Sequence, residues 1–383
     1  MSVPSSTISP RSNPIYGEDD FEGAEEILRA WGEGLTPDPD LTVSEWADRH
    51  RMLSGRASAE PGRYRTARTP YMGEIMDRLS PGDPTQRIVF MKAAQVGATE
   101  AGNNWIGFAI HQAPGPMLAV QPTVELAKRN SRQRIDPLID ESPELRERVK
   151  PARSRDAGNT MLSKEFAGGI LIMTGANSAV GLRSTPARYI FLDEVDAYPA
   201  SADEEGDPVT LAEARSLTFA HRRKVFLVST PTIRGLSRIE REFEASDQRR
   251  FFVPCPHCGQ EQWMKFERLR WQKGRPETAE YHCERCETPI AEHHKTAMLE
   301  ACAGPDGRSH VPGDLRCRVG GCALRGRCRR PSLQGHGRCH RSPARPGLHR
   351  LGPRRLQLRL VHLWHRRMDK RGKCRAASGG HRT

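Results

Sequence analysis

A short apolar stretch that runs directly into two carboxylates constrains this chain more than any other feature. Phe191 and Leu192 lead into Asp193 and Glu194 within the run YIFLDEVDAYP. A buried parallel strand that ends in this way can present one acid to a magnesium ion and the next to an attacking water. That arrangement suits nucleotide hydrolysis. A core strand that merely ends in a charged turn has the same pattern, so the neighbouring segments must decide.

Strand-like and helix-like segments alternate from residue 87 onward. We expect strands at 88–91, 117–120, 170–174, 189–193 and 225–229, and helices at 42–52, 70–79, 99–111, 124–134 and 209–220. Apolar strands that alternate with helices are typical of an α/β fold, with a parallel sheet covered by helices on both faces. Ligands of such sheets bind at the carboxyl ends of the strands.

The loop after the first of these strands has the form of a phosphate-binding loop with a displaced lysine. Against the pattern G-x-x-x-x-G-K-[ST], Gly97 and Thr99 fall in place, but Ala98 takes the lysine position and Lys92 that of the first glycine. A glycine, a magnesium-binding hydroxyl and amides at a helix start are still available. We therefore predict that Lys92, Gln95, Gly97, Ala98 and Thr99 bind ATP. An ordinary strand-to-helix turn is the alternative.

Two further segments fit the same site. The strand at 225–229 ends in hydroxyls, so Ser229, Thr230 and Thr232 could sense whether the γ-phosphate is present. Arg183, in the segment GLRSTPAR, could stabilise the charge that spreads over that phosphate in the transition state. The alternatives are a plain turn of Ser, Thr and Pro and a solvated arginine.

Together these segments resemble the large terminase subunit of lambda-type tailed phages. The similarity lies in the early lysine, the LDEVDAYP strand end, the STPT segment and the RYRTARTPYM stretch at 63–72, and it extends from about residue 42 to 298. The resemblance implies that Glu194 activates water, that Asp193 and Thr99 serve Mg²⁺, and that Lys92 holds the phosphates. It also implies that residues 229–232 couple hydrolysis to movement and that residues 63–70 lie near the adenine.

The resemblance implies a P-loop ATPase domain over residues 41–250 and a motor that packages double-stranded DNA. Such a motor works as a homo-oligomer with a terminase small subunit and a portal protein. A helicase-like translocase would share the loop and the acidic strand but needs a second motor lobe, and a non-enzymatic zinc-ribbon DNA-binding protein is a third possibility. We expect a cytoplasmic protein, because no apolar run approaches the roughly 20 residues that cross a bilayer and no signal peptide is visible.

Two C-x-x-C pairs predict a metal site. Cys255 and Cys258 are separated by 24 residues from Cys283 and Cys286, a spacing suited to one tetrahedral Zn²⁺. Gly259 can adopt the positive φ that a tight turn after the first pair needs, whereas glutamate stands at the corresponding place after the second. We expect a structural zinc ribbon over 251–290, with His257 outside the ligand set. Four unpaired buried cysteines are the alternative.

The two ends of the chain have compositions of their own. Residues 1–40 are rich in Ser, Pro, Gly and acidic side chains, and we expect disorder there apart from a short amphipathic helix at 21–31. Residues 301–383 contain 21 Lys+Arg and three Asp, whereas the first 300 residues carry 39 Lys+Arg against 44 Asp+Glu. The basic character of the chain therefore comes from an irregular, arginine-rich tail.

This tail has two interpretations. It could be a basic arm that neutralises DNA phosphates. We favour a shifted reading frame, because arginine with almost no lysine and scattered Cys and His are typical of GC-rich DNA translated out of frame. Proteins of the resembling family carry a metal-dependent nuclease domain after the ribbon, and three acidic residues are too few to build one. We therefore expect a truncated prophage protein without nuclease activity, whose six tail cysteines bind no metal.

Overall fold

The computed structural model describes residues 23–35, 39–55, 58, 60–149 and 159–302 of the 383-residue chain. Contacts divide the chain into two units, residues 1–40 and 41–383. In the first unit, the described element is helix α1 (Ala24–Leu35), on which Ile27, Leu28, Trp31 and Leu35 are exposed. The amphipathic helix expected at 21–31 is therefore present, about three residues later in the chain. The arginine-rich tail lies outside the described residues.

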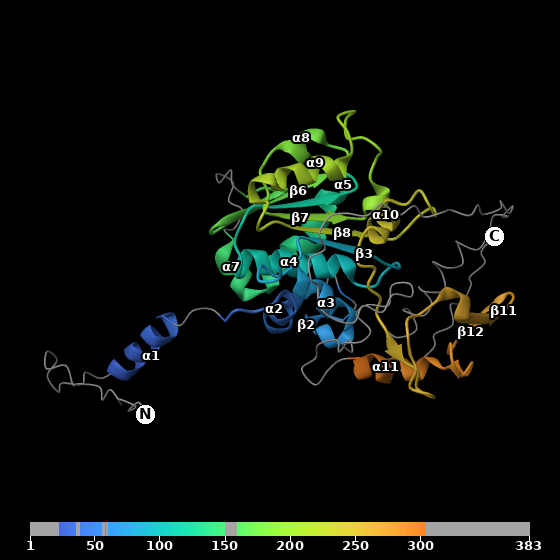
Figure 1. The fold of residues 1–383 in the computed structure, drawn as a ribbon. Coiled ribbons are helices and arrows are strands. Elements are labelled where there is room, and N and C mark those ends of the chain that lie inside the picture. Colours follow the sequence, from blue (N-terminus) through green and yellow to red (C-terminus); the bar gives the residue numbers. More distant parts are fainter. Residues whose placement is uncertain (1–22, 36–38, 56–57, 59, 150–158, 303–383) are drawn as a thin grey trace, which may run out of the picture. The chain divides into compact units, whose positions relative to one another are not determined.

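A six-stranded sheet forms the centre of the second unit (Figure 1). Its order is β3-β8-β7-β4-β6-β5, with β3 at Arg87–Met91, β4 at Met117–Gln121, β5 at Ser163–Phe166, β6 at Gly169–Gly175, β7 at Tyr189–Asp193 and β8 at Lys224–Ser229. The first five strands in this order are parallel to one another, and β5, at the edge, is antiparallel to β6. The α/β prediction is confirmed, but the sheet is mixed. The edge strand was missed because its sequence, SKEF, is half charged.

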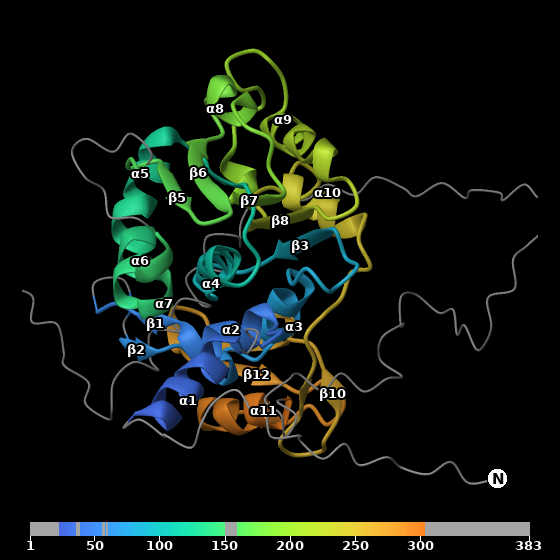
Figure 2. The same ribbon diagram turned by 90° about the vertical axis from the view of Figure 1, so that its left-hand side faces the viewer.

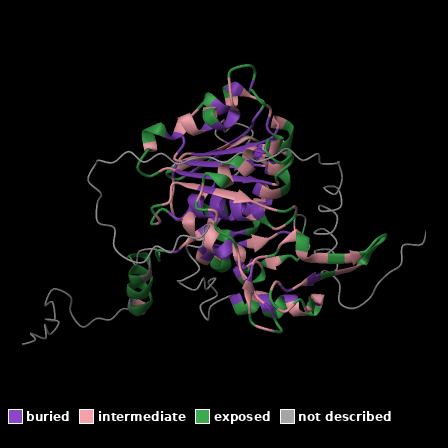
Figure 3. Cartoon of the chain, turned by 45° about the vertical axis from the view of Figure 1, so that its right-hand side comes forward, coloured by how far each residue is buried: buried purple, intermediate pink, exposed green. Residues whose placement is uncertain are grey.

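Side chains of the central strands alternate between two apolar layers. On β7, Tyr189 and Phe191 pack into one cluster, and Ile190 and Leu192 into the other. Residues of α2 (Val43–His50), α3 (Tyr71–Arg78), α4 (Ala98–His111), α6 (Asp136–Glu141) and α7 (Pro143–Arg148) belong to the first cluster, and residues of α8 (Ala179–Arg183), α9 (Pro208–Glu213) and α10 (Arg238–Glu244) to the second. Helices therefore cover both faces of the sheet, as predicted (Figures 1 and 2). Figure 3 shows the buried residues gathered in the sheet and in α4.

Helix α4 lies directly on the acidic strand. A Cβ atom added to Gly102 would lie 2.1 Å from the Cζ atom of Phe191, so only glycine allows this approach. A second glycine, Gly107, faces Trp46 of α2 in the same way, at 2.3 Å. The helix that follows the loop at 92–97 is thus pressed against the strand that carries the two carboxylates.

The helix expected at 124–134 is interrupted. α5 (Val124–Asn130) leads into a π turn at Ser131–Ile135, and the chain continues as α6. The amide of Asp136 donates to the carbonyl of Ser131, five residues earlier. Pro137 explains the widening, because it has no amide hydrogen and its ring clashes with a carbonyl of the preceding α-helical turn.

The remaining elements are short. The hairpin β1 (Met52–Leu53) with β2 (Gly62–Arg63) precedes the sheet, and 3₁₀ turns lie at Thr66–Arg68, Val195–Ala197 and Ala214–Phe219, the last completing the helix expected at 209–220. Helix α2 begins with a Thr cap: Thr42 Oγ1 accepts from the amide of Glu45, whose carboxylate accepts from the amide of Thr42. Within the described residues, no helix is long and apolar enough to cross a membrane.

A small module follows the sheet. It contains β9 (Val253–Pro254) paired with β10 (Glu261–Gln262), and a three-stranded sheet of β11 (Leu269–Gln272), β12 (Arg275–His282) and β13 (Pro289–Ile290). 3₁₀ turns lie at Phe266–Arg268 and Glu292–His294, before helix α11 (Lys295–Cys302). The apolar cluster of the module includes Val253, Tyr281, Ile290, Met298 and Cys302. Its packing therefore continues past residue 290 into α11.

Candidate functional site

The loop between β3 and α4 leaves backbone amides available to a ligand. Gln95 and Gly97 adopt left-handed backbone conformations, with φ of 59° and 86°. Gly97 is the N-cap of the 14-residue helix α4, and no side chain caps that helix. The first amides of the helix, with the positive end of its dipole, therefore face the loop. An anion such as phosphate is the ligand that this arrangement attracts.

Lys92, at the start of this loop, contacts the acidic strand end. Its Nζ lies 2.5 Å from Oε1 of Glu194 and 3.1 Å from Oγ1 of Thr230. The side chain of Lys92 is 6% exposed and that of Glu194 is 38% exposed. Because β8 lies between β3 and β7, three neighbouring strand ends bring these side chains together. The carboxylate that holds the ammonium is itself open to solvent.

Asp193 is buried beside the loop. One carboxylate oxygen, Oδ2, accepts hydrogen bonds from Thr99 Oγ1 at 3.1 Å and Gln121 Nε2 at 3.2 Å, whereas Oδ1 is buried with no hydrogen-bond partner among the described residues. Burial raises the pKa of Asp193 to about 6. A buried carboxylate with an unused oxygen and a hydroxyl beside it is a donor set that fits Mg²⁺. Gln121 was not predicted, although it is the one polar residue that ends the apolar strand MLAVQ.

Asp196 ties the turn after β7 to the turn after β8. Its Oδ2 accepts from the amide and the hydroxyl of Thr232 at 2.9 and 3.0 Å, and its amide donates to Ser229 Oγ at 3.1 Å. Ser229 Oγ in turn lies 3.4 Å from Oε2 of Glu194, which has a left-handed backbone with φ of 55°. Two of the predicted coupling residues, Ser229 and Thr230, thus contact Glu194, and the third, Thr232, contacts Asp196.

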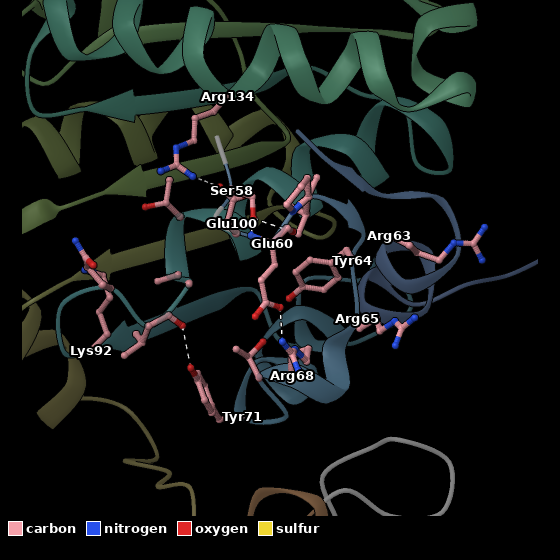
Figure 4. Close-up of a pocket in the computed structure, with 18 of the residues that line it drawn as sticks. Ser58, Glu60, Arg63, Tyr64, Arg65, Arg68, Tyr71, Lys92, Glu100 and Arg134 are labelled. Carbon is pink, nitrogen blue, oxygen red and sulfur yellow. Dashed lines mark hydrogen bonds and ion pairs between the residues drawn. The ribbon is translucent and has the colours of Figure 1, made fainter. Parts of the chain in front are cut away.

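A pocket of about 930 Å³ opens over the loop (Figure 4). The predicted residues that line it are Lys92, Gln95, Gly97, Ala98, Thr99 and Glu194. Its other wall comes from the segment at 63–71, including Tyr64 and Tyr71, and the Tyr71 hydroxyl donates to the carbonyl of Val96 in the loop at 3.1 Å. The volume lies in the range of pockets for nucleotide-sized ligands. Two lining residues that no motif indicated are Glu100 and Arg134.

Arg183 does not reach this pocket. It lies at the end of α8, is 48% exposed, and forms an ion pair with Glu205 at 2.7 Å. Thr232 also stays outside the lining and contacts Asp196 instead. The structure therefore does not place Arg183 at the pocket, and its action on the γ-phosphate stays a prediction.

The four predicted cysteines form one cluster. Their sulfur atoms all lie within 4.8 Å of one another, with 3.9 Å between Cys255 and Cys286 and 3.7 Å between Cys258 and Cys283. Zn–S bonds of about 2.3 Å in a tetrahedron require sulfur separations of about 3.8 Å, so the donor set fits Zn²⁺. No other group of three or more His, Cys, Asp or Glu with this proximity occurs in the part of the chain that the structure describes.

The two turns that carry the cysteines are similar despite different residues. Gly259 follows the first pair with φ of 69°, and Glu287 follows the second with φ of 57°. The Glu287 carboxylate forms ion pairs with Arg268 and Arg270, which holds the side chain in place. Glutamate therefore does what glycine does in the first turn, at some backbone strain. His257 is not in the cluster, and its Nε2 lies 3.2 Å from the carbonyl of Pro289.

Comparison with known proteins gives consistent relatives. Residues 58–303 match the family described as phage terminase large subunit gpA, ATPase domain. The chain is 30% identical over 252 residues to the large terminase subunit of Enterobacteria phage P21 and 28% identical over 256 residues to that of Escherichia phage lambda. These matches cover 64% and 65% of this chain but 39% of each relative, so the chain spans about two fifths of the length of the curated relatives it matches.

Solved structures of large terminases are also similar. The ATPase domain from Thermus phage P74-26 is 14% identical, with a TM-score of 0.31, and the match covers 49% of this chain and 74% of that one. The large terminase of another thermophilic bacteriophage is 20% identical, with a TM-score of 0.32, and the match covers 43% of this chain and 39% of that one.

Proposed function

Because the chain belongs to the phage terminase large subunit gpA ATPase family, we propose that it is the ATP-hydrolysing motor subunit of a terminase that packages double-stranded DNA. The observation that carries this proposal is the contact between Lys92 Nζ and Glu194 Oε1, 2.5 Å apart and 102 positions apart in the sequence. It joins the displaced lysine of the phosphate loop to the acidic strand end within one pocket of nucleotide size.

The loop binds the triphosphate. The ammonium of Lys92 and the free amides at the start of α4 bind the phosphate oxygens, with Gln95, Gly97 and Ala98 forming the floor. The triphosphate takes the place of Glu194 as the partner of Lys92. Nucleotide binding therefore releases the carboxylate that hydrolysis needs.

Glu194 acts as the general base. Once released from Lys92, its carboxylate accepts a proton from the water whose oxygen attacks the γ-phosphorus, and ADP and phosphate leave as products. Ser229 Oγ and the amide of Thr230, each 3.4 Å from Oε2, orient the carboxylate. Through Asp196, the same hydrogen bonds pass a change at the γ-phosphate on to Thr232 and the start of α10.

Thr99 and Asp193 would hold Mg²⁺. The unpartnered buried Oδ1 of Asp193 and the Thr99 hydroxyl supply oxygen donors, and the cation would neutralise charge on the β- and γ-phosphate oxygens. In the nucleotide-free protein, burial raises the pKa of Asp193, because the hydrogen bonds from Gln121 and Thr99 and the charge of Lys92 only partly offset the desolvation of its carboxylate.

The module after the ATPase domain is a zinc ribbon in this proposal. Cys255, Cys258, Cys283 and Cys286 would hold one structural Zn²⁺, which supplies folding free energy that the small apolar cluster of the module lacks. Four thiolates would complete the tetrahedral coordination that Zn²⁺ prefers and would leave no position for water, so the ion would have a structural and not a catalytic role.

The partners follow from the family. The chain acts as a homo-oligomer on double-stranded DNA, together with a terminase small subunit and a portal protein, in the cytoplasm of the host cell. The curated relatives that support this are large terminase subunits of phages P21 and lambda.

ATP hydrolysis with and without double-stranded DNA tests the proposal. We expect DNA-stimulated release of phosphate by the parent chain, and its loss in Lys92→Ala and Glu194→Ala variants that still fold. A parent chain that binds DNA but hydrolyses ATP no faster than either variant would instead identify a non-enzymatic DNA-binding protein.

A further inference from the structure

Arg134 lines the nucleotide pocket but belongs to none of the motifs that define it. Its guanidinium forms an ion pair with Glu100, the residue that follows Thr99 in the first turn of α4. In Figure 4, Arg134 and Lys92 approach the pocket from different sides. The Arg134 side chain is 37% exposed, so it is open to a ligand that enters the pocket.

The π turn sets the direction of the Arg134 side chain. A regular helix from 124 to 141 is prevented by Pro137, and the wide turn at Ser131–Ile135 results. Ser131 and Ile135 are fully buried in that turn, so the backbone of Arg134 is firmly held. π turns are uncommon and often occur at functional sites, because they change the direction of one side chain within a helix.

Glu100 does not depend on Arg134 for a counter-charge. Its other oxygen lies 3.2 Å from Nη2 of Arg51, a buried arginine whose Nη1 also donates to the carbonyl of Met52. Arg51 therefore stays with Glu100 when Arg134 moves away. Arg51 can balance the charge of Glu100 by itself, so Glu100 does not need Arg134, which is the arginine exposed to the pocket.

The net charge of the residues that line the pocket also favours a phosphate ligand. Its lining contains five cationic side chains, Arg63, Arg65, Arg68, Lys92 and Arg134, but three carboxylates, Glu60, Glu100 and Glu194. The excess of positive charge favours a polyanion. Within the loop at 92–99, Lys92 is the single cationic side chain, so a second cation from another element would help to neutralise a triphosphate that carries several negative charges.

We infer that Arg134 is a second phosphate-binding residue, which exchanges Glu100 for the triphosphate when ATP binds. The inference rests on the proposed ATPase function and adds a residue to that site. Glu100 serves as the partner that holds the guanidinium at the edge of the pocket before the nucleotide arrives. The planar, forked guanidinium can bind two phosphate oxygens at once, which lysine cannot.

Equilibrium binding of ATPγS with Mg²⁺ to the full chain tests this inference. We expect Arg134→Ala to raise the Kd about 10- to 100-fold, the loss expected for a charge-assisted hydrogen bond, and Arg134→Lys to recover part of it. Arg132→Ala is the matched control, because Arg132 is an exposed arginine of the same π turn. Its Kd should equal that of the parent.

Unfolding separates a binding role from a structural one. Because Arg51 remains beside Glu100, nucleotide-free Arg134→Ala should have the urea midpoint of the parent, while ATPγS should stabilise it less. Equal affinities of Arg134→Ala, Arg132→Ala and the parent would overturn the inference and leave the ATPase proposal standing. A parent chain that binds no ATPγS would overturn both.

Discussion

The nucleotide pocket and the cysteine cluster both assemble residues that are distant in the sequence, but different forces hold them. The pocket lies at the ends of strands whose side chains, such as Phe191 and Phe226, are fully buried in a large apolar cluster. The cysteine cluster rests on a few apolar residues, among them Val253, Tyr281 and Ile290. We therefore expect the first site to be in place before its ligand arrives, and the second to need its ligand in order to fold.

Removal of the metal is the strongest way to break this comparison. Structural Zn²⁺ contributes roughly 10–16 kcal/mol of apparent binding free energy in small zinc domains. We expect chelation to expose the amides of 253–302 to hydrogen exchange while those of β3, β7 and β8 stay protected. Cys283→Ser should have the same effect without a chelator. Simultaneous loss of protection in both regions would mean that the sheet also depends on the metal.

Gly102→Ala tests the packing that positions the pocket. The new Cβ would lie 2.1 Å from the ring of Phe191, which is itself stacked on Phe226 and cannot withdraw. Overpacking of this kind costs about 3 kcal/mol, and urea unfolding measures it. Gly82→Ala is the control, because its Cβ would meet no atom within 4 Å. Equal midpoints for the two variants would show that α4 does not rest on β7 as described.

Asp193→Asn should stabilise the nucleotide-free protein. The folded pKa of about 6 lies above the ordinary value of 3.8, so stability from this group is complete below about pH 4 and is lost as the pH rises through 6. At pH 7.5 the buried charge costs up to about 3 kcal/mol, which Asn avoids. Urea unfolding at pH 7.5 and pH 5 checks this. A variant no more stable than the parent at pH 7.5 would contradict the account.

The elements that carry chemistry were predictable where a local pattern encodes them. The strand at 189–193 was predicted with the bounds that the structure has, because every residue before Asp193 is apolar. Gly97 and Thr99 were recognisable because a phosphate loop requires a glycine and a hydroxyl at that spacing. The cysteine pairs likewise combine residue type with spacing.

Other residues of the site could not be found in this way. Gln121 is the one polar residue of β4 and lies beside Asp193, whereas Arg134 is one of several polar residues of the π turn and lines the pocket. Only the packing of those elements places the two side chains there. Arg183 differs, because an arginine that fits a functional pattern lies on α8 beside Glu205 and outside the pocket lining, so its role stays a prediction. A local sequence pattern indicates which chemistry a side chain can perform, but the tertiary packing determines where that side chain lies.

A smaller effect is expected where the two regions touch. The ring of Phe251, next to the cysteine module, lies 5.8 Å from that of Tyr71 in an edge-on arrangement, and Tyr71 binds the phosphate loop through Val96. A double-mutant cycle with Tyr71→Leu and Phe251→Leu should give a coupling free energy of about 0.5–1.5 kcal/mol. A cycle that pairs Tyr71→Leu with Trp271→Leu serves as the control. Zero coupling in the first cycle would make the two regions independent.

The central claim is that Lys92 and Glu194 act on one triphosphate, and the affinity of Glu194→Gln for ATPγS with Mg²⁺ tests it most directly. In the free protein the Glu194 carboxylate competes with phosphate for Lys92. Removing its charge should therefore tighten nucleotide binding several-fold while ATP turnover falls by about 100-fold or more, whereas Lys92→Ala should weaken binding. Glu125→Gln, at an exposed helix position, should change neither quantity. Weaker binding by Glu194→Gln with turnover retained would contradict the account.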